Sequence, residues 1–449
     1  MFRTILIANR GEIALRIVRA CRDLGIRSVV AHSQADAASL PVRAADAAIC
    51  IGPPEASRSY LNAAALLSAA EVVKADALHP GYGFLAENAE LAEVCAAAGV
   101  AFIGPSAGSL RLLGDKLRAR ELAARVGVPV LPGAALPGPD PAGAVRVAAE
   151  LGYPLMLKAT AGGGGRGMRV VADEGALGAV LGGAQAEAAA AFGDATLYLE
   201  RYLDAPRHVE VQVAADASGR VIHLGERDCS VQRRHQKLLE EAPAPGVSPE
   251  LRARLGEAAV RVAAAAGYRT LGTAEFLMDA AGRFSFIEMN ARIQVEHPVT
   301  EMVTGLDLVT EQIRLAAGEP LTLSASVEQP FGHALECRIN AEHPDTFVPS
   351  PGVVTSVVVP GGPGIRWDSH VYGGYAIPPH YDSLVGKLIA HGRTRDEARR
   401  RMLRALGELR LEGIATSIPL HQRILADAEF AAGRVSTGLL SRILAHAVV

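Results

Sequence analysis

The amino-terminal segment alternates between strand and helix patterns. Residues Thr4–Ala8 are apolar and β-prone, Glu12–Leu24 has apolar residues at helical spacing before Gly25, and Arg27–His32 is again strand-like. A strand–helix–strand unit predicts a parallel sheet, and the pattern continues to about residue 113. The first turn lacks G-x-G-x-x-G, so the dinucleotide-binding fingerprint is absent there.

Composition excludes several classes of protein. The 449 residues suggest about three domains, and 45 basic residues against 48 acidic ones leave a net charge of -3. This balance gives no electrostatic footprint for nucleic acid or an anionic membrane. No apolar run approaches the roughly 20 residues of a transmembrane helix, and the amino terminus lacks a signal-peptide core. We therefore expect a cytoplasmic protein with neither nucleic-acid nor membrane partners.

The five cysteines are scattered and form no Cys-x-x-Cys pair. They support neither a disulfide framework nor a zinc ribbon. Since free cysteine is commonly a small core residue, most of them are expected to be reduced and buried.

A glycine-rich loop lies between two strand-like segments. Residues 162–167 match G-x-G-x-x-G, but Tyr153–Lys158 before it and Met168–Val171 after it both look like strands. A Rossmann turn needs a helix next, and a Walker A loop needs Gly-Lys-Ser/Thr, so neither motif fits. We expect a hairpin loop that closes over phosphates with its backbone N–H groups, with Lys158 within reach; the alternative is a surface linker.

A second hairpin brings two carboxylates together. Gly272–Asp279 and Arg283–Asn290 are strand-like, and a two-residue turn at Ala281-Gly282 would set Glu275 directly opposite Glu288. Like charges facing across a ladder are destabilising unless a cation lies between them. With Asn290 on the same face, the pair predicts a Mg²⁺ or Mn²⁺ site.

Strict alternation continues beyond this hairpin. Glu288, Asn290, Arg292, Gln294 and Glu296 are polar, and the residues between them are apolar. An amphipathic strand with one solvent-facing side would produce the same pattern. The mixture of metal-type ligands with an arginine and a further acid favours a functional extended segment instead.

Lysine is rare in this chain. Only five of the 45 basic residues are lysine, so a position that keeps lysine may be one that needs a compact ammonium group instead of a planar guanidinium. The five are Lys74, Lys116, Lys158, Lys237 and Lys387.

The motifs, taken together and in order, resemble those of the biotin carboxylase subunit of bacterial acetyl-CoA carboxylase and the equivalent domain of pyruvate and propionyl-CoA carboxylases. The resemblance runs nearly from end to end of the chain. It rests on segments 7–14, 79–85, 104–105, 114–116, 162–168, 226–230, 232–237, 286–301 and 336–340.

The resemblance implies an α/β fold of the ATP-grasp type. Its expected parts are a Rossmann-like parallel-sheet domain at 1–113, a glycine-loop lid at 130–203, and a mixed α+β carboxy-terminal part at 204–449. A helix is expected to begin at Ser248-Pro249, and 396–411 has helical spacing. ATP would lie between the lid and the carboxy-terminal part.

The resemblance also implies the site residues. Those matching ATP-binding positions are Lys116, Lys158, Gly164, Gly165, Glu200, Arg201, Leu203, His208, Gln232, His235, Glu275 and Glu288. The metal ligands would be Glu275, Glu288 and Asn290, holding two Mg²⁺ or Mn²⁺ ions. Bicarbonate would meet Lys237, Arg292, Gln294 and Val295. Glu296 would be the base, and Tyr82 and Arg338 would meet biotin. Three of the five lysines fall on these positions.

Two positions depart from the family pattern. Arg201 stands where relatives often carry lysine, and Ala161 replaces a first glycine of the loop. For Arg338, the alternative role is a structural ion pair with Glu336 or Asp382.

The implied reaction is the ATP- and bicarbonate-dependent carboxylation of biotin through carboxyphosphate. No Ala-Met-Lys-Met attachment motif occurs, so biotin is expected on a separate carrier protein, with separate carboxyltransferase subunits. A homodimer and a role in acetyl-CoA carboxylase, at the start of fatty-acid synthesis, are further implications. Propionyl-CoA or pyruvate is the alternative acceptor. A carboxylate–amine ligase and a non-catalytic ATP-binding module are competing interpretations.

Overall fold

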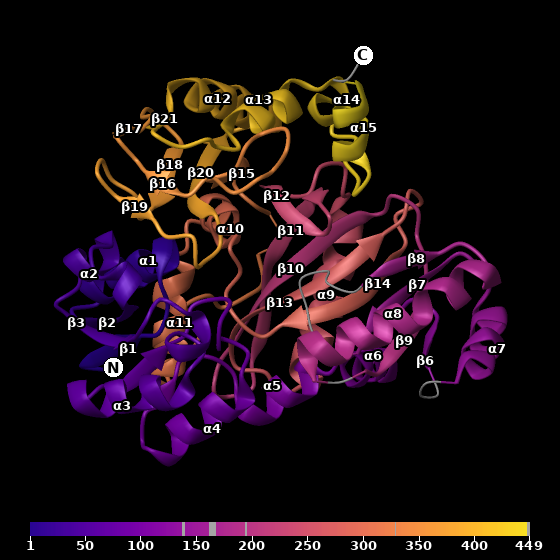
Figure 1. The fold of residues 1–449 in the computed structure, drawn as a ribbon, viewed down its shortest axis with the longest axis horizontal. Helices are drawn as coiled ribbons and strands as arrows, with labels where there is room; N and C mark the ends of the chain where they lie inside the picture. The colour runs from indigo at the N-terminus through magenta and orange to yellow at the C-terminus, as the bar shows by residue number, and fades with distance from the viewer. Residues whose placement is uncertain (137–139, 161–167, 194, 328, 447–449) are drawn as a thin grey trace.

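The computed structural model describes residues 1–136, 140–160, 168–193, 195–327 and 329–446 (Figure 1). Three sheets organise the chain. A parallel sheet forms the amino-terminal part, a small sheet forms a projecting unit, and a long antiparallel sheet runs through the rest.

The amino-terminal sheet has the strand order β3-β2-β1-β4-β5, and all its pairings are parallel. Its strands are β1 Thr4–Ile7, β2 Arg27–Ser33, β3 Ala47–Gly52, β4 Ala77–His79 and β5 Ala101–Phe102. The predicted strand–helix–strand unit is confirmed, because helix α1 spans Gly11–Asp23 between β1 and β2. The other helices of this part are α2 Leu40–Ala44, α3 Ala63–Val73, α4 Ala89–Ala97, α5 Ala107–Gly114 and α6 Lys116–Arg125. Two short 3₁₀ turns are η1 Gln34–Asp36 and η2 Ala56–Arg58.

The strand order reverses between β1 and β4, and this point holds the first part of the site. Open parallel sheets bind ligands at the carboxyl ends of the strands that flank such a reversal. Asn9, which follows β1, donates from Nδ2 to the carbonyls of Pro80 and Tyr82, each at 2.7 Å. These bonds fix the loop after β4, which carries Tyr82.

The projecting unit is a four-stranded sheet with the order β6-β9-β7-β8. Its elements are β6 Gly133–Ala135, α7 Pro141–Leu151, β7 Leu155–Ala159, β8 Arg169–Val171, α8 Glu174–Phe192 and β9 Leu197–Arg201. The predicted strand pair around the glycine loop is confirmed, because β7 and β8 are antiparallel neighbours. Residues 131–143, expected to be a plain connection, instead contain β6, which pairs with β9. The unit has an apolar core of its own, built from residues such as Leu155, Leu177 and Leu197.

The long sheet has eight antiparallel strands in the order β14-β13-β10-β11-β12-β15-β20-β18. They are β10 Arg207–Ala215, β11 Val221–Arg233, β12 Gln236–Ala242, β13 Thr270–Met278, β14 Phe284–Asn290, β15 His333–Asn340, β18 Ile365–Ser369 and β20 Leu384–Gly392. Two small strand pairs lie beside it: β16 Gly352–Val353 with β19 Ala376–Ile377, and β17 Ser356–Val358 with β21 Arg410–Glu412.

The helices of this part are α9 Pro249–Ala265, α10 His297–Thr304, α11 Leu308–Ala316, α12 Arg395–Glu408, α13 Ile418–Ala426, α14 Ala428–Ala431 and α15 Leu439–His446. The predicted start at Ser248 is confirmed, because its side chain accepts a hydrogen bond from the backbone N–H of Leu251 and so caps α9. The arginine-rich helix ends at Glu408, earlier than its spacing suggested, because the chain then enters β21.

Candidate active site

A single cavity of about 500 Å³ gathers the predicted residues from all three sheets. Of those that the structure describes, only Glu296 is not on the cavity wall, and it is fully buried beside it. The wall includes Tyr82, Lys116, Lys158, Glu200, Arg201, Leu203, His208, Gln232, His235, Lys237, Glu275, Glu288, Asn290, Arg292, Gln294, Val295 and Arg338. Gly164, Gly165 and Ala161 lie outside the described residues.

The predicted carboxylate pair exists, although the predicted turn is wrong. Glu275 on β13 is directly opposite Glu288 on β14. The hairpin loop has three residues, since the Asp279 N–H donates to the Arg283 carbonyl and the last loop residue, Gly282, has a φ of 74°. A bulge at Ile287 then restores the register that brings the two glutamates together.

The polar residues beyond Asn290 reach the cavity without forming a strand. Strand β14 ends at Asn290, and α10 begins at His297. The predicted extended run is therefore wrong as secondary structure. The alternation still separates two environments, because Ile293 is buried in the core while Arg292 and Gln294 line the cavity.

The turn between β11 and β12 places three further wall residues. Strand register pairs Arg233 with Gln236, so Arg234 and His235 form a two-residue turn, with φ of 48° and 66°. Such turns usually use Asn and Gly, and left-handed φ at bulkier residues is strained. The strain is located where Gln232, His235 and Lys237 meet the cavity.

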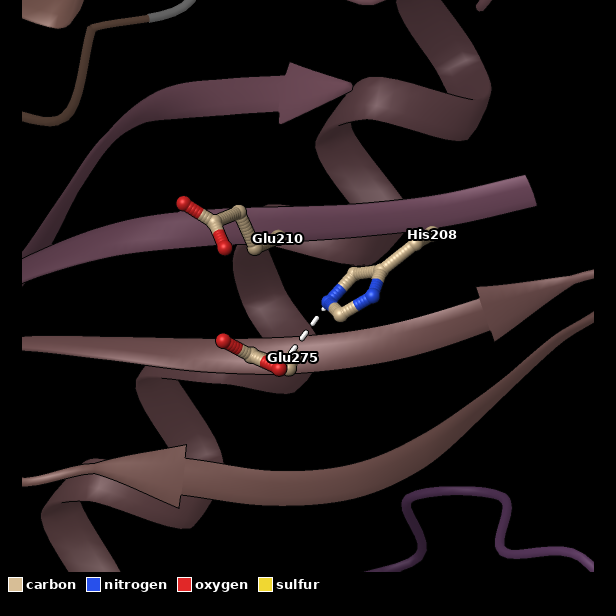
Figure 2. A group of neighbouring side chains, drawn as sticks. All are labelled: His208, Glu210 and Glu275. Carbon is tan, nitrogen blue, oxygen red and sulfur yellow. Dashed lines mark ion pairs between the residues drawn. The ribbon is translucent and has the colours of Figure 1, made fainter. Parts of the chain in front are cut away.

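Three glutamates lie in a row across neighbouring strands. Glu210 on β10 is opposite Glu275 on β13, which is in turn opposite Glu288 on β14. His208 and Glu210 project from one strand toward Glu275 on the next, and His208 Nε2 lies 2.9 Å from Glu275 Oε2 (Figure 2). Such a row requires cations, because like charges facing each other across a ladder are unfavourable.

Lys237 supplies most of this compensation. Its ammonium donates to Glu210 Oε2 at 2.5 Å, Glu275 Oε1 at 2.8 Å and Glu296 Oε1 at 2.7 Å. Burial by itself would lower the pKa of Lys237, but the surrounding carboxylates raise it well above its ordinary value. At the end of the row, Lys116 Nζ lies 3.5 Å from Glu288 Oε2.

Glu296 lies between two cations. Lys237 contacts one oxygen, and Arg338 Nη2 donates to the other at 2.9 Å. Burial favours a raised pKa for Glu296, but Lys237 and Arg338 reverse this and hold its pKa well below the ordinary value. Arg338 Nε also donates to Glu240 at 2.6 Å. Among the described residues, Arg338 thus forms its ion pairs with Glu240 and Glu296 instead of the alternative partners Glu336 and Asp382.

The residues on the projecting unit make separate contacts. Lys158 on β7 donates to Glu200 on β9, which also accepts from Arg120 on α6. Lys158 was predicted to reach a phosphate, and in the structure its ammonium is bound to Glu200. Arg201 donates from Nη2 to the carbonyl of Leu151 at 3.2 Å.

Three family models match successive parts of the chain. The biotin carboxylase amino-terminal domain matches residues 1–110, the ATP-binding domain of the carbamoyl-phosphate synthase L chain matches 115–324, and the biotin carboxylase carboxy-terminal domain matches 336–442.

Individual proteins match over nearly the whole length. The biotin carboxylase of Haemophilus influenzae is 54% identical over 445 residues, which are 99% of each chain. The chain belongs to the biotin carboxylase family. A biotin carboxylase complex with "beta-gamma-ATP" from Campylobacter jejuni superimposes with a TM-score of 0.96 and is 47% identical, covering 98% of this chain and 99% of that one.

A third match shows ligands of the family. The biotin carboxylase domain dimer of Hydrogenobacter thermophilus 2-oxoglutarate carboxylase, in complex with MgADP, ADP and bicarbonate, is 46% identical, with a TM-score of 0.95 and 99% of both chains covered. These matches confirm the predicted ATP-grasp fold and enzyme class, a carboxylase that acts as a ligase.

The donor set of the biotin carboxylase site fits a hard divalent cation. Glu275 and Glu288 face each other, and Asn290 adds an amide on the same strand as Glu288. Oxygen donors of this kind are the ligands that Mg²⁺ prefers. Glu275 Oε1 already collects hydrogen bonds from Asn290 Nδ2, Gln294 Nε2 and Lys237, which keeps its pKa below the ordinary value despite burial.

Sequence reasoning missed three carboxylates that hold the predicted residues. Glu87 accepts from the backbone N–H of Ala291 at 2.8 Å and from Arg292 Nε at 3.1 Å. Glu210 and Glu240 pair with Lys237 and Arg338. The family motifs quoted above do not contain these positions. Only the alternation of Glu210 with His208 along β10 hinted at a shared face.

None of the helices in the described ranges combines the length and the apolar character that a bilayer crossing requires.

Proposed function

We propose that this chain carboxylates biotin held on a separate carrier protein, using ATP and bicarbonate, and that Glu296 is the general base. The observation that supports the proposal is the position of Glu296 between Lys237 and Arg338, with 2.7 and 2.9 Å contacts on its two oxygens. Lys237 belongs to the predicted bicarbonate set and Arg338 to the predicted biotin set. One buried carboxylate therefore touches both halves of the reaction.

On the bicarbonate side, Lys237 and Arg292 would hold the anion against the γ-phosphate. Arg292 is oriented by Glu87, by Asn290 Oδ1 at 2.9 Å and by Gln294 Oε1 at 2.9 Å. A guanidinium held on several sides loses little freedom when an anion binds, which favours proximity and orientation as the main contribution. Bicarbonate would attack the γ-phosphate to give carboxyphosphate and ADP.

The protonation state of Glu296 matches its proposed role only in part. Its depressed pKa keeps it ionised, but a carboxylate held by two cations is a weak proton acceptor. Substrates would correct this, because bicarbonate would draw Lys237 away and the biotin ureido oxygen would draw Arg338 away. The basicity of Glu296 would then rise only when both partners are bound.

Arg338 would stabilise the negative oxygen of the biotin enolate. Carboxyphosphate would release CO₂ and phosphate, the phosphate would take the ureido proton, and the enolate nitrogen would attack CO₂. A buried, charged donor aimed at developing charge is an effective form of such stabilisation. Tyr82 faces the same cavity.

On the nucleotide side, Lys158, Glu200, Arg201, Leu203, His208, Gln232 and His235 would surround ATP, with Lys116 near the phosphates. A metal held by Glu275, Glu288 and Asn290 would neutralise charge on the transferring phosphoryl group. Lys158 would exchange Glu200 for a phosphate.

We further propose a carrier protein and carboxyltransferase subunits as partners, a homodimer as the assembly, and acetyl-CoA as the final acceptor. The acceptor stays open to pyruvate or propionyl-CoA, since one relative is part of a 2-oxoglutarate carboxylase. The transferase partner determines the acceptor, and none of the proposed site residues contacts it.

The test is ADP formation with Mg²⁺ and bicarbonate, with and without free biotin. We expect ADP formation to require bicarbonate and to rise strongly with biotin. ADP formation that ignores biotin and depends on an amine would instead indicate a carboxylate–amine ligase, the class suggested by the central family match.

A further inference from the structure

Lys387 is a buried cation to which neither the sequence nor the proposed function gives a role. Two lysines lie outside the predicted site, and Lys74 is exposed at the end of α3. The side chain of Lys387, on β20, is 0% exposed. A buried ammonium is unfavourable unless it is paired, so its partners indicate why a lysine is there.

The ammonium of Lys387 lies beneath the turn that carries the bicarbonate and base residues. It donates to the carbonyl of Val295 at 2.7 Å and lies 3.2 Å from Glu12 Oε1. Strand register places Lys387 directly opposite Arg338, so both side chains leave the sheet on one face. Burial by itself would lower the pKa of Lys387, but Glu12 and neighbouring carboxylates raise it, so the group stays charged.

The contact fixes the backbone of the turn. The peptide that Lys387 holds joins Val295 to Glu296. The preceding carbonyl, of Gln294, is held by the His297 ring at 2.7 Å. Both peptide planes around Val295 are therefore anchored from below. Rotation of either one would turn the Val295 N–H and the Glu296 side chain away from their present directions.

Glu12 extends the contact to the biotin side. Its Oε1 atom, which pairs with Lys387, also accepts a hydrogen bond from the Tyr82 hydroxyl. Glu12 is 3% exposed and lies in the first turn of α1, beside the point where the parallel sheet reverses its order. One carboxylate oxygen thus joins a biotin-side side chain to a bicarbonate-side backbone.

We propose that Lys387 and Glu12 are positioning residues that form a buried bridge, Tyr82–Glu12–Lys387–Val295, between the biotin side and the bicarbonate side of the cavity. The inference rests on the proposed function. The bridge touches no predicted nucleotide-binding residue. A compact ammonium suits it, because two acceptors converge on one atom, whereas a guanidinium would spread its donors over a wider fork.

The test is Lys387→Met, which keeps the stem and removes the charge. We expect KM for bicarbonate to rise by about tenfold, the size of one lost charged hydrogen bond, with KM for free biotin rising in parallel and KM for ATP unchanged. The matched control is Arg395→Met. Arg395 also pairs with a buried glutamate, Glu241 at 2.6 Å, and with a carbonyl, that of Ala431 at 3.1 Å, away from the cavity.

Arg395→Met should lower the melting temperature and leave all three KM values unchanged. An unchanged bicarbonate KM in Lys387→Met, or an equal rise in the KM for ATP, would overturn the bridge. If Lys387→Met does not fold, Glu12→Gln decides. Its amide oxygen can still accept from Tyr82, but it loses the charge, and unchanged KM values for bicarbonate and biotin would contradict the bridge. Wild-type enzyme that ignores biotin would contradict the proposed function instead.

Discussion

The long sheet and the projecting four-stranded unit hold their charged site residues in different ways. On the long sheet, Lys237 binds three carboxylates at once, and Glu296 is bound by two cations. On the projecting unit, Lys158 has the carboxylate of Glu200, from the neighbouring strand. The first network needs no partner from the nucleotide side, whereas Lys158 must leave Glu200 to meet a phosphate. The bicarbonate half is thus assembled before substrates bind, and the nucleotide half rearranges.

The largest effect should come from Glu296, where the assembled half does its chemistry. Glu296→Gln keeps the shape of the side chain and removes the base. We expect turnover in ADP formation to fall by about 10²–10⁴-fold while KM for ATP stays unchanged, because the nucleotide half is separate. Steady-state kinetics check this, and turnover near that of wild type would refute the base assignment.

Removing Lys237 should break the assembled half itself. Lys237→Met leaves Glu210, Glu275 and Glu296 buried without their shared cation, which we expect to reduce the free energy of unfolding by about 3–5 kcal/mol at neutral pH. Urea unfolding measures this. Equal stability of variant and wild type would show that the carboxylates are compensated elsewhere.

The same network sets the direction of the wild-type pH dependence. Glu275 and Glu296 have folded pKa values below the ordinary 4.5, so they stabilise the fold above that pH. This stabilisation is lost as the pH falls below about 4.5. The Lys237→Met penalty should shrink over the same range, because the carboxylates then bind protons. A penalty that grew on acidification would contradict this account.

Lys158 probes the rearranging half. Lys158→Met removes a cation that is to bind phosphate, so KM for ATP should rise by about tenfold, with KM for bicarbonate unchanged. If both constants rose together, the two halves would not be separable. Arg169→Met is a control on the same small sheet, because it removes only an exposed pair with Glu187.

The smallest effect is expected at Glu336, a buried carboxylate of the long sheet. Burial raises its pKa well above the ordinary value, and Lys387 offsets this only in part. A raised carboxyl pKa destabilises the fold as the pH rises above about 4.5. Glu336→Gln should therefore gain roughly 1–2 kcal/mol relative to wild type between about pH 5 and pH 8, with turnover within about twofold. Parallel stability profiles would show that Glu336 is already ionised.

Local patterns predicted the elements well. The strand–helix–strand start, the cap at Ser248 and the hairpin around the glycine loop all depend on neighbours in sequence. The pairing of Glu275 with Glu288 was predicted from a two-residue turn that does not exist, and a bulge at Ile287 restored the register. Two local errors cancelled, and nothing in the alternation of residues could reveal either one.

The supporting contacts could not be predicted, because they join distant segments. Glu12 meets Lys387, and Glu240 meets Arg338, across gaps of 375 and 98 residues. Charge alone indicated no partner. The turn at Arg234 and His235 was missed for a different reason, since residues of this kind seldom adopt left-handed backbone and give no turn signal.

The most direct measurement is the transfer of labelled bicarbonate to free biotin, followed as acid-labile carboxybiotin, with ATP and Mg²⁺. The account predicts label in biotin that depends on ATP and disappears in both Glu296→Gln and Arg338→Gln. ADP formation without any labelled biotin in the wild-type enzyme, or full labelling in either variant, would contradict it.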